Sequence, residues 1–364
     1  MVFDMNEVLV LLRTIRDSVV PEPVVDFWCE EFGLIHRRSQ SIAKAVKVVS
    51  ETQETVSIWL KPNRNFKGVQ PGQHINVGVH IDGHLVQRSY SVSHVKGRLF
   101  RITARKVENG KASSYLNDHA RKGMIFQLGE AYGDMTVNQF SDKPALFLAG
   151  GIGITPIISM LERWSGTVRQ QPVQLVYWGK RAQDLAFVER LKKMAAEHSW
   201  FEFKLLETEF LERNKDGTPK LFVETSAWFQ ELKAKLPSFD AFACGNDGFV
   251  SQIRDRISPW VNQFHFESFS PLVFASEVGL PVQINLTKQR RSVSVPSGMN
   301  LLLALEKAGV AVTSGCRRGT CNTCSCKKLS GVALNQSDRT LHDAHDGGFK
   351  PCTHSALTDI TLEL

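Results

Sequence analysis

The alternation of hydrophobic and polar residues changes along this chain of 364 residues and divides it into distinct segments. Between residues 40 and 140, short runs place apolar side chains at every second position, which is the spacing of half-buried strands. These runs are Ala43–Val49, Thr55–Leu60, His74–His80 and Leu99–Ala104. Several short strands of this kind predict an antiparallel β-barrel for the segment 40–140.

The segment 141–271 carries continuous apolar runs that alternate with helical patterns. The predicted strands are Pro144–Ala149, Val173–Trp178, Phe201–Leu206 and Asp240–Gly245. Helices are expected after the glycine-rich turn that follows Ala149, over Asp184–His198, and from Phe249 onward. Strands that alternate with helices predict a parallel, doubly wound α/β sheet with its ligand at the carboxyl ends of the strands.

After a predicted linker at 272–280, the segment 281–364 begins with two short alternating runs, Val282–Leu286 and Ser292–Val295, which predict a hairpin. A helical run over Met299–Ala308 follows and ends at Gly309. The sequence therefore predicts a third, α+β unit.

Residues 1–39 belong to none of these units. Apolar residues recur there at helical spacing, before Pro21 and Pro23 end the pattern; they are Val8, Leu9, Leu12, Ile15 and Val19. We expect a helical N-terminal extension. It either packs on the neighbouring barrel or faces a partner or a membrane surface.

Composition excludes several classes of protein. A net charge of +7 without a basic tail or a nucleic-acid motif argues against binding to DNA or RNA. The N-terminus lacks the basic-then-apolar order of a signal peptide. Ala145–Leu161 is uncharged, but it contains three glycines and a proline and is too short to span a bilayer comfortably. We expect a cytoplasmic protein, with peripheral contact to the inner face of the membrane as a further option.

Four cysteines carry the strongest chemical signal. Their order is Cys316-x4-Cys321-x2-Cys324, followed by Cys352. This is the plant-type spacing for a [2Fe–2S] cluster, in which thiolates hold the two irons. A zinc site favours paired C-x2-C units, of which only one is present, and disulfides suit a secreted scaffold better. Cys326 lies outside the set of four. The whole segment 281–364 resembles the β-grasp ferredoxin domain.

Basic residues surround the cysteine loop, whereas many plant-type ferredoxins are acidic. They are Arg317, Arg318, Lys327 and Lys328. They form either a solvated rim or a docking face for an acidic partner or an anionic membrane.

A glycine-rich turn follows the strand Pro144–Ala149. Gly150, Gly151 and Gly153 would let the backbone approach a pyrophosphate, Thr155 is a candidate helix N-cap, and Pro156 suits a first helical turn. The start of the helix also offers free N–H groups to an anion. The third glycine of the dinucleotide fingerprint is replaced by Pro156, so this turn alone is weak support.

With the later Cys244–Asp247 and His265–Phe269, the segment Gly150–Pro156 resembles the nicotinamide domain of the ferredoxin–NADP⁺ reductase family. The resemblance implies that Cys244 and Gly245 lie beside the nicotinamide and that Glu267 lies near the reacting edge of the flavin. The alternatives are a buried strand-end thiol for Cys244 and an ordinary ion pair for Glu267.

The segment 40–140 carries the flavin motifs of the same family. Arg88-Ser89-Tyr90-Ser91 resembles its R-x-Y-S/T motif, which implies that Arg88 contacts flavin phosphate, Tyr90 packs on the isoalloxazine and Ser91 sits near N5. A second phosphate loop is implied by Gly110, Ala112, Ser113 and Ser114. Alternatively, Arg88 forms an exposed salt bridge and Tyr90 is a core ring. The order of the motifs favours FAD over FMN.

Together these resemblances imply a reductase that passes electrons from NAD(P)H through FAD to its own [2Fe–2S] cluster and on to an external acceptor. Ser91, Cys244 and Glu267 would align the nicotinamide with the flavin. Arg181 follows the strand Val173–Trp178, where a cation can meet a 2′-phosphate, and this favours NADPH over NADH.

The acceptor is the least determined part. The N-terminal extension before a flavin barrel and a ferredoxin tail resembles the reductases of membrane-bound fatty-acyl (stearoyl-CoA) desaturases. A ring-hydroxylating or ring-epoxidising oxygenase or a hybrid-cluster protein is the alternative. A redox sensor is disfavoured because a sensor needs no hydride-transfer site. The sequence leaves the oligomeric state open.

Overall fold

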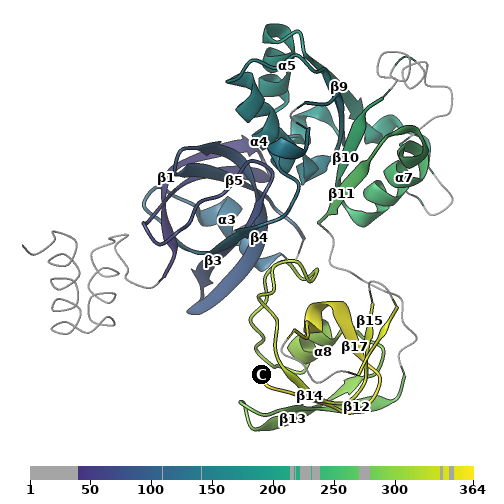
Figure 1. Cartoon of the computed structure of the whole chain (residues 1–364). Coiled ribbons are helices and arrows are strands. Elements are labelled where there is room, and N and C mark those ends of the chain that lie inside the picture. The colour runs from purple at the N-terminus through teal and green to yellow at the C-terminus, as the bar shows by residue number, and fades with distance from the viewer. Residues whose placement is uncertain are drawn as a thin grey trace, which may run out of the picture.

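A computed structural model describes residues 40–108, 110–140, 142–213, 217, 219–221, 231, 238–269, 279–336, 339–343 and 348–364. These residues form three units in chain order: a barrel, a parallel α/β sheet and a small α+β unit (Figure 1). The predicted N-terminal extension, and the predicted linker apart from Gly279 and Leu280, lie outside the described residues.

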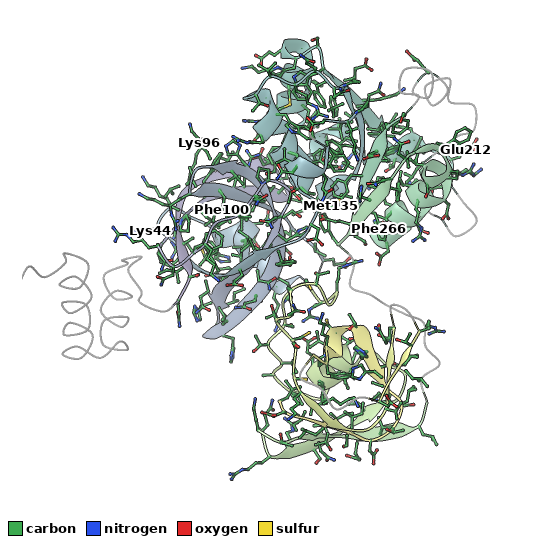
Figure 2. The ribbon with its side chains drawn as sticks, in the orientation of Figure 1. Lys44, Lys96, Phe100, Met135, Glu212 and Phe266 are labelled. Carbon is green, nitrogen blue, oxygen red and sulfur yellow. The ribbon has the colours of Figure 1, made fainter. Side chains whose placement is uncertain are left out.

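The first unit is a closed antiparallel barrel with the strand order β1-β2-β5-β4-β3-β6. Its strands are β1 (Ile42–Thr52), β2 (Thr55–Pro62), β3 (His74–Ile81), β4 (His84–Lys96), β5 (Leu99–Arg105) and β6 (Ile125–Tyr132). Every second residue of β3, namely Ile75, Val77 and Val79, packs in the barrel core with Phe100, which Figure 2 labels. Helix α3 (Lys111–His119) adds Leu116 to this core. The predicted barrel is confirmed.

The second unit is a parallel sheet with the strand order β11-β10-β7-β8-β9. Its elements are β7 (Ala145–Gly150), α4 (Ile154–Ser165), β8 (Val173–Gly179), α5 (Val188–Glu197), β9 (Phe201–Glu207), β10 (Asp240–Gly245), α7 (Asp247–Ile257) and β11 (Phe264–Ser268). Both faces of the sheet are buried. Phe147 and Tyr177 pack with α4 and α5, whereas Leu148 and Trp178 pack with α7. This explains the continuous apolar runs, and the doubly wound prediction is confirmed.

Two local expectations in this unit are wrong. Helix α5 begins at Val188 rather than Asp184. Ala182–Asp184 instead form a 3-10 turn, and Phe187 before the helix has a φ of 66°. A bulky residue rarely adopts this left-handed conformation. The Phe187 ring lies 4.5 Å from the Arg101 guanidinium of the barrel, so a contact between units holds it there. Thr155 is the second residue of α4 and not its N-cap; its hydroxyl donates to the Ile152 carbonyl at 3.0 Å.

The third unit contains a mixed sheet, β13-β12-β18-β14, and a small sheet, β16-β15-β17. The strands are β12 (Pro281–Leu286), β13 (Arg291–Pro296), β14 (Lys328–Ser330), β15 (Ala333–Asn335), β16 (Leu341–His342), β17 (His354–Ala356) and β18 (Ile360–Leu362). Helix α8 (Leu301–Lys307) is shorter than predicted, because the Asn300 side chain caps it by accepting from the Leu303 N–H. Gly309, with a φ of 72°, follows its end as expected. The α+β prediction is confirmed.

Among the described residues, no helix is both long enough and apolar enough to cross a bilayer.

Candidate functional site

The four cysteines of the third unit come together as two pairs. Hydrogen bonding from Cys316 lowers the pKa of the Cys321 thiol to about 4. A hydrogen bond from Cys352 lowers the pKa of the Cys324 thiol to about 7. A plant-type cluster has two irons held by four thiolates, so two adjacent pairs of sulfurs fit this donor set. Within the described part of the chain, no group of three His, Cys, Asp or Glu residues is arranged to hold a single metal ion.

The loop that carries three of these cysteines turns its backbone N–H groups toward sulfur. The amides of Arg318 and Cys321 donate to Cys316 Sγ at 3.3 and 3.4 Å, and the Cys316 amide donates to Cys321 Sγ at 3.2 Å. Residues with a left-handed φ make the tight curl; they are Arg317, Gly319 and Asn322. Such donors stabilise negative charge on sulfur, which is the condition for binding iron.

The basic residues around this loop are mostly engaged within the chain. Arg317 pairs with Glu306 of α8, and Arg318 lies 3.5 Å from Asp247 of the second unit. Lys328 is fully buried, and its ammonium donates to the Gly331 carbonyl at 2.6 Å. Of the four, Lys327 alone is exposed. A docking face formed by all four cations therefore has little support.

The flavin motif lies on β4. Tyr90 packs against the barrel core, and burial raises its pKa. Ser89 Oγ hydrogen-bonds to the Tyr132 hydroxyl. Burial lowers the pKa of Arg88, and the nearby Arg317 lowers it further. Arg88 thus lies close to the cysteine-bearing unit.

The predicted phosphate loop forms the start of α3. Gly110 is the N-cap residue, and a Cβ there would lie 2.5 Å from Ser113 Oγ, so only glycine fits without a shift. Ser113 accepts from the Val107 amide, and the Ser114 amide donates to the Gly110 carbonyl. Ala112 is buried against the barrel. The first turn of α3 can therefore present N–H groups to an anion.

The glycines after β7 serve packing as well as ligand approach. A Cβ on Gly153 would lie 1.9 Å from the Cys244 carbonyl oxygen, and Cβ atoms on Gly150 or Gly245 would meet the Phe249 ring at 2.8 and 2.6 Å. Gly151, with a φ of 53°, lies next to Arg105 of the barrel. Pro156 stands in the first turn of α4 as predicted.

The three residues predicted to align the nicotinamide and the flavin are joined by a histidine that belongs to none of the sequence motifs. His74 Nδ1 lies 2.9 Å from Ser91 Oγ, and His74 Nε2 lies 2.9 Å from Glu267 Oε1. Glu267 Oε2 in turn lies 4.0 Å from Cys244 Sγ. The structure thus brings Ser91, Glu267 and Cys244 together from the barrel and the α/β unit through His74. In the sequence, His74 is marked only as the first residue of the predicted strand His74–His80, directly after Pro71-Gly72-Gln73.

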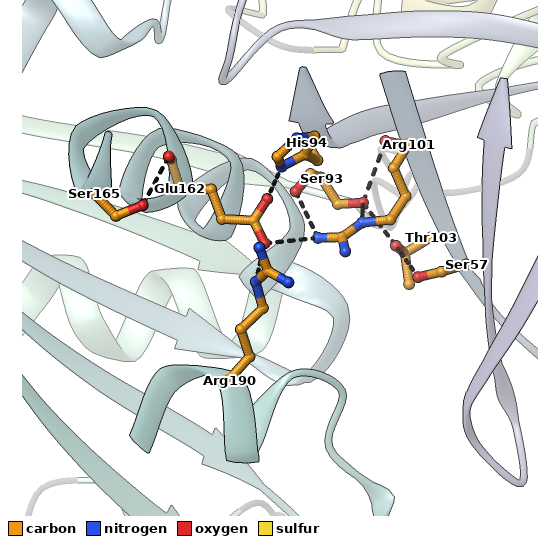
Figure 3. Close-up of polar contacts among 8 residues, drawn as sticks. All are labelled: Ser57, Ser93, His94, Arg101, Thr103, Glu162, Ser165 and Arg190. Atoms are coloured by element: carbon orange, nitrogen blue, oxygen red, sulfur yellow. Dashed lines mark hydrogen bonds and ion pairs between the residues drawn. The ribbon is translucent and has the colours of Figure 1, made fainter. Parts of the chain in front are cut away.

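A buried carboxylate fixes the barrel against the α/β unit (Figure 3). Glu162 of α4, with a side chain only 2% exposed, pairs with His94 and Arg101 of the barrel and with Arg190 of α5. Arg101 also donates to Ser93 and lies over the ring of Trp59. The relative position of the two units is therefore set by buried charge.

Arg181 lies at the carboxyl end of β8, as expected, and forms an ion pair with Asp184 at 2.9 Å. This hydrogen bond raises the pKa of Arg181. A 2′-phosphate at this place would compete with the Asp184 carboxylate.

Three segments of the chain match known domain families. Residues 42–136 match the oxidoreductase FAD-binding domain, and residues 147–255 match the oxidoreductase NAD-binding domain. Residues 284–356 match the 2Fe-2S iron-sulfur cluster binding domain. The chain is a reductase, like ferredoxin–NADP⁺ reductase in its fold, with FAD-binding, NAD-binding and [2Fe–2S] ferredoxin domains.

Curated relatives align with most of the length of the reductase. An NADPH oxidoreductase of Mycobacterium tuberculosis is 25% identical over 86% of this chain and 82% of its own. The glycine betaine monooxygenase reductase subunit of Pseudomonas aeruginosa is 25% identical over 88% and 94%. The NADH oxidoreductase HCR of Escherichia coli is 28% identical over 85% and 94%.

A solved structure has the same overall fold. Phthalate dioxygenase reductase, described as a modular structure for electron transfer from pyridine nucleotides to [2Fe–2S], superposes with a TM-score of 0.59. The match covers 89% of this reductase and 97% of that chain at 21% identity. The expected sub-family of desaturase reductases is not among these findings. The expected cofactor set of FAD, a nicotinamide nucleotide and a [2Fe–2S] cluster is confirmed.

Proposed function

We propose that the reductase carries electrons from NAD(P)H through FAD and its own cluster to the oxygenase component of a multicomponent oxygenase. The observation that carries this proposal is the position of the cysteine loop. It lies against the barrel, where the Asn76 side chain donates to Thr323 Oγ1 at 2.7 Å. A cluster so close to the flavin domain is placed to take electrons from it. Relatives named as oxygenase reductases support the choice of acceptor.

Each predicted site residue has a role in this scheme. Bound FAD would supply the chemistry that converts a two-electron hydride donor into single electrons, and the iron–sulfur cluster held by the cysteines would supply one-electron transfer. Ser91, Cys244 and Glu267 orient the reacting edges, and the His74 contacts hold Ser91 and Glu267 in place. The cofactor-binding residues on the barrel are Arg88, Ser89, Tyr90, Gly110, Ala112, Ser113 and Ser114. Those on the α/β unit are Gly150, Gly151, Gly153, Thr155, Pro156, Arg181 and Gly245.

For the cluster, we propose that the thiolates of Cys316, Cys321, Cys324 and Cys352 would hold the two irons. The amides that donate to Cys316 Sγ and Cys321 Sγ support this ligand set. Cys326 is a buried thiol outside this set, and burial raises its pKa to about 12. It therefore supplies a matched non-ligand control.

The test is an anaerobic titration of the purified reductase with NADPH and, separately, NADH, followed by visible absorption and low-temperature EPR. The expected result is bleaching of the flavin band together with the EPR signal of a reduced [2Fe–2S] cluster. Cys316→Ser should abolish electron delivery to cytochrome c while NAD(P)H still bleaches the flavin. Cys326→Ser should retain both. Equal loss of flavin reduction in Cys316→Ser would overturn the modular electron path.

Among acceptors, a membrane fatty-acyl desaturase is the more specific proposal. It rests on the apolar stripe of the N-terminal extension, which lies outside the described residues. The deciding experiment is reconstitution: the reductase is mixed with desaturase-bearing membranes or with an oxygenase component, and NAD(P)H-dependent product is measured. Turnover with only one class identifies the acceptor, and turnover with neither refutes the oxygenase proposal.

A further inference from the structure

Asn76 is a polar residue on the outer side of the barrel that is nevertheless buried. It lies on β3 between Ile75 and Val77, whose side chains belong to the barrel core. Because side chains alternate along a strand, Asn76 points away from that core. An outward-facing asparagine should be exposed, yet Asn76 is only 5% exposed. The ferredoxin domain covers it.

Two residues of the cysteine loop, Gly315 and Thr323, contact Asn76 and shield it from solvent. The Asn76 amide donates to Thr323 Oγ1 at 2.7 Å. A Cβ on Gly315 would lie 2.4 Å from Asn76 Nδ2 and 2.7 Å from its Cγ, so the amide plane lies directly on the Gly315 backbone. Gly315 precedes Cys316 and Thr323 precedes Cys324. Asn76 therefore touches the loop beside two of the proposed ligands.

This contact is linked to the flavin motif by further hydrogen bonds. The Tyr132 hydroxyl donates to Asn76 Oδ1 at 3.3 Å and is hydrogen-bonded to Ser89 of the flavin motif. Ser89, Tyr132, Asn76 and Thr323 thus form a continuous hydrogen-bonded chain from the flavin strand to the cysteine loop.

Another contact of this loop with the rest of the reductase, between described residues, is weaker. Arg318 lies 3.5 Å from Asp247, whose side chain is 50% exposed. Water and salt screen such a pair. The Asn76 contact is buried, so breaking it leaves polar groups without solvent to replace the lost partner.

We propose that Asn76 docks the ferredoxin domain on the flavin barrel and thereby sets the rate of electron transfer from flavin to cluster. In this step the reduced flavin loses one electron and the oxidised cluster gains it, and no bond is made or broken. Asn76 acts as a positioning residue, because it holds the distance between the two centres. The inference rests on the proposed cluster ligands.

The experiment uses full-length holoprotein and compares Asn76→Ala, Thr323→Val and the double variant. Stopped-flow absorbance separates flavin reduction by NAD(P)H from the later reduction of the cluster. Each single variant should slow the second phase about 3- to 10-fold, the effect of losing one neutral hydrogen bond on docking, and leave the first phase unchanged. The double variant should be no slower than the slower single variant, and Thr323→Ser should restore the rate.

A second readout does not depend on turnover. Hydrogen–deuterium exchange of residues 313–324 should accelerate in Asn76→Ala, since the loop loses its cover. Asn285→Ala is the matched control: Asn285 also bonds a hydroxyl, that of Ser292, but on the exposed face of the ferredoxin sheet. It should change neither the exchange nor the electron step.

Gly315→Ala tests the same contact from the other side, because the added methyl would displace the Asn76 amide. It should slow the second phase about tenfold or more, whereas Gly166→Ala, whose Cβ meets only the Arg163 carbonyl oxygen at 3.8 Å, should not. If any one of these variants fails to fold, the others carry the test. An unchanged second phase in Asn76→Ala and Gly315→Ala overturns the proposal, as does equal slowing of both phases. Loss of the cluster's EPR signal only in Cys316→Ser shows that the ligand assignment stands independently.

Discussion

Replacing Glu162 by alanine is expected to loosen the flavin barrel from the nucleotide domain. The Glu162 carboxylate is the shared partner of His94, Arg101 and Arg190, and its side chain is 2% exposed. The Arg190 side chain is 51% exposed and can be hydrated once the carboxylate is removed, so losing its ion pair with Glu162 costs little stability. The Arg101 side chain is 4% exposed and cannot be hydrated in this way.

The magnitude follows from Arg101. Removing one partner of a buried ion pair costs about 3–5 kcal/mol, because the other charge stays buried without compensation. Arg101 keeps its hydrogen bonds to Ser93 and its contacts with the rings of Trp59 and Phe187. We therefore expect the lower end of the range, about 3 kcal/mol.

The assay is urea unfolding of the FAD-loaded reductase, followed by flavin fluorescence and by circular dichroism. A chain of several domains need not unfold in one step, so the relevant quantity is the midpoint of the transition that releases flavin. Glu162→Ala should clearly lower the urea concentration at this midpoint. The double variant Glu162→Leu/Arg101→Met should recover most of the loss, since an apolar pair of similar volume is often as stable as a buried ion pair.

Glu130→Ala is the matched control, because Glu130 also pairs with a cation, Lys67, but both side chains are about 80% exposed. It should leave the midpoint unchanged. A Glu162→Ala midpoint equal to that of Glu130→Ala would refute the reasoning, and so would a double variant that is less stable than Glu162→Ala alone.

Two further predictions concern the nucleotide and the hydride step. His74→Ala removes the bridge between Ser91 and Glu267 and should slow flavin reduction by NAD(P)H about tenfold at unchanged nucleotide affinity; a stopped-flow rate equal to that of the parent would contradict this. Arg181→Ala should raise the KM for NADPH about tenfold and leave that for NADH unchanged, the effect of losing one charge-assisted hydrogen bond, whereas Asp184→Ala should lower the KM for NADPH by releasing Arg181. Steady-state kinetics with both nucleotides checks this, and equal effects on both would remove Arg181 from 2′-phosphate recognition.

The sequence was most informative where chemistry or periodicity is local. The cysteines from Cys316 to Cys324 lie within one short segment, and so do the alternating residues of β3. Each pattern correctly indicated the unit to which its residues belong. The start of α5 was mispredicted because Phe187 takes its unusual backbone conformation next to Arg101, a residue of another domain.

The residues that join the domains were missed for the same reason. Asn76 and Thr323 are 247 positions apart, and His94 and Glu162 are 68 apart. Neither His74 nor Glu162 belongs to a motif, since the role of each depends on a partner that periodicity cannot locate. Whether an outward-facing asparagine on a strand, such as Asn76, contacts water or another domain depends on how the folded domains pack against each other.

The strand order of the ferredoxin sheet has a consequence for how the molecule is made. Strand β18 lies in the middle of that sheet, between β12 and β14, and its residues 360–362 pair in parallel with Ile284–Leu286. The hairpin β12–β13 leaves the ribosome well before its central neighbour does, and Cys352 also follows the other three cysteines by a long interval. Domains tend to fold in the order of synthesis. The barrel and the nucleotide domain can thus fold, and become able to bind FAD, before the chain supplies the last strand and the last thiol of the iron site.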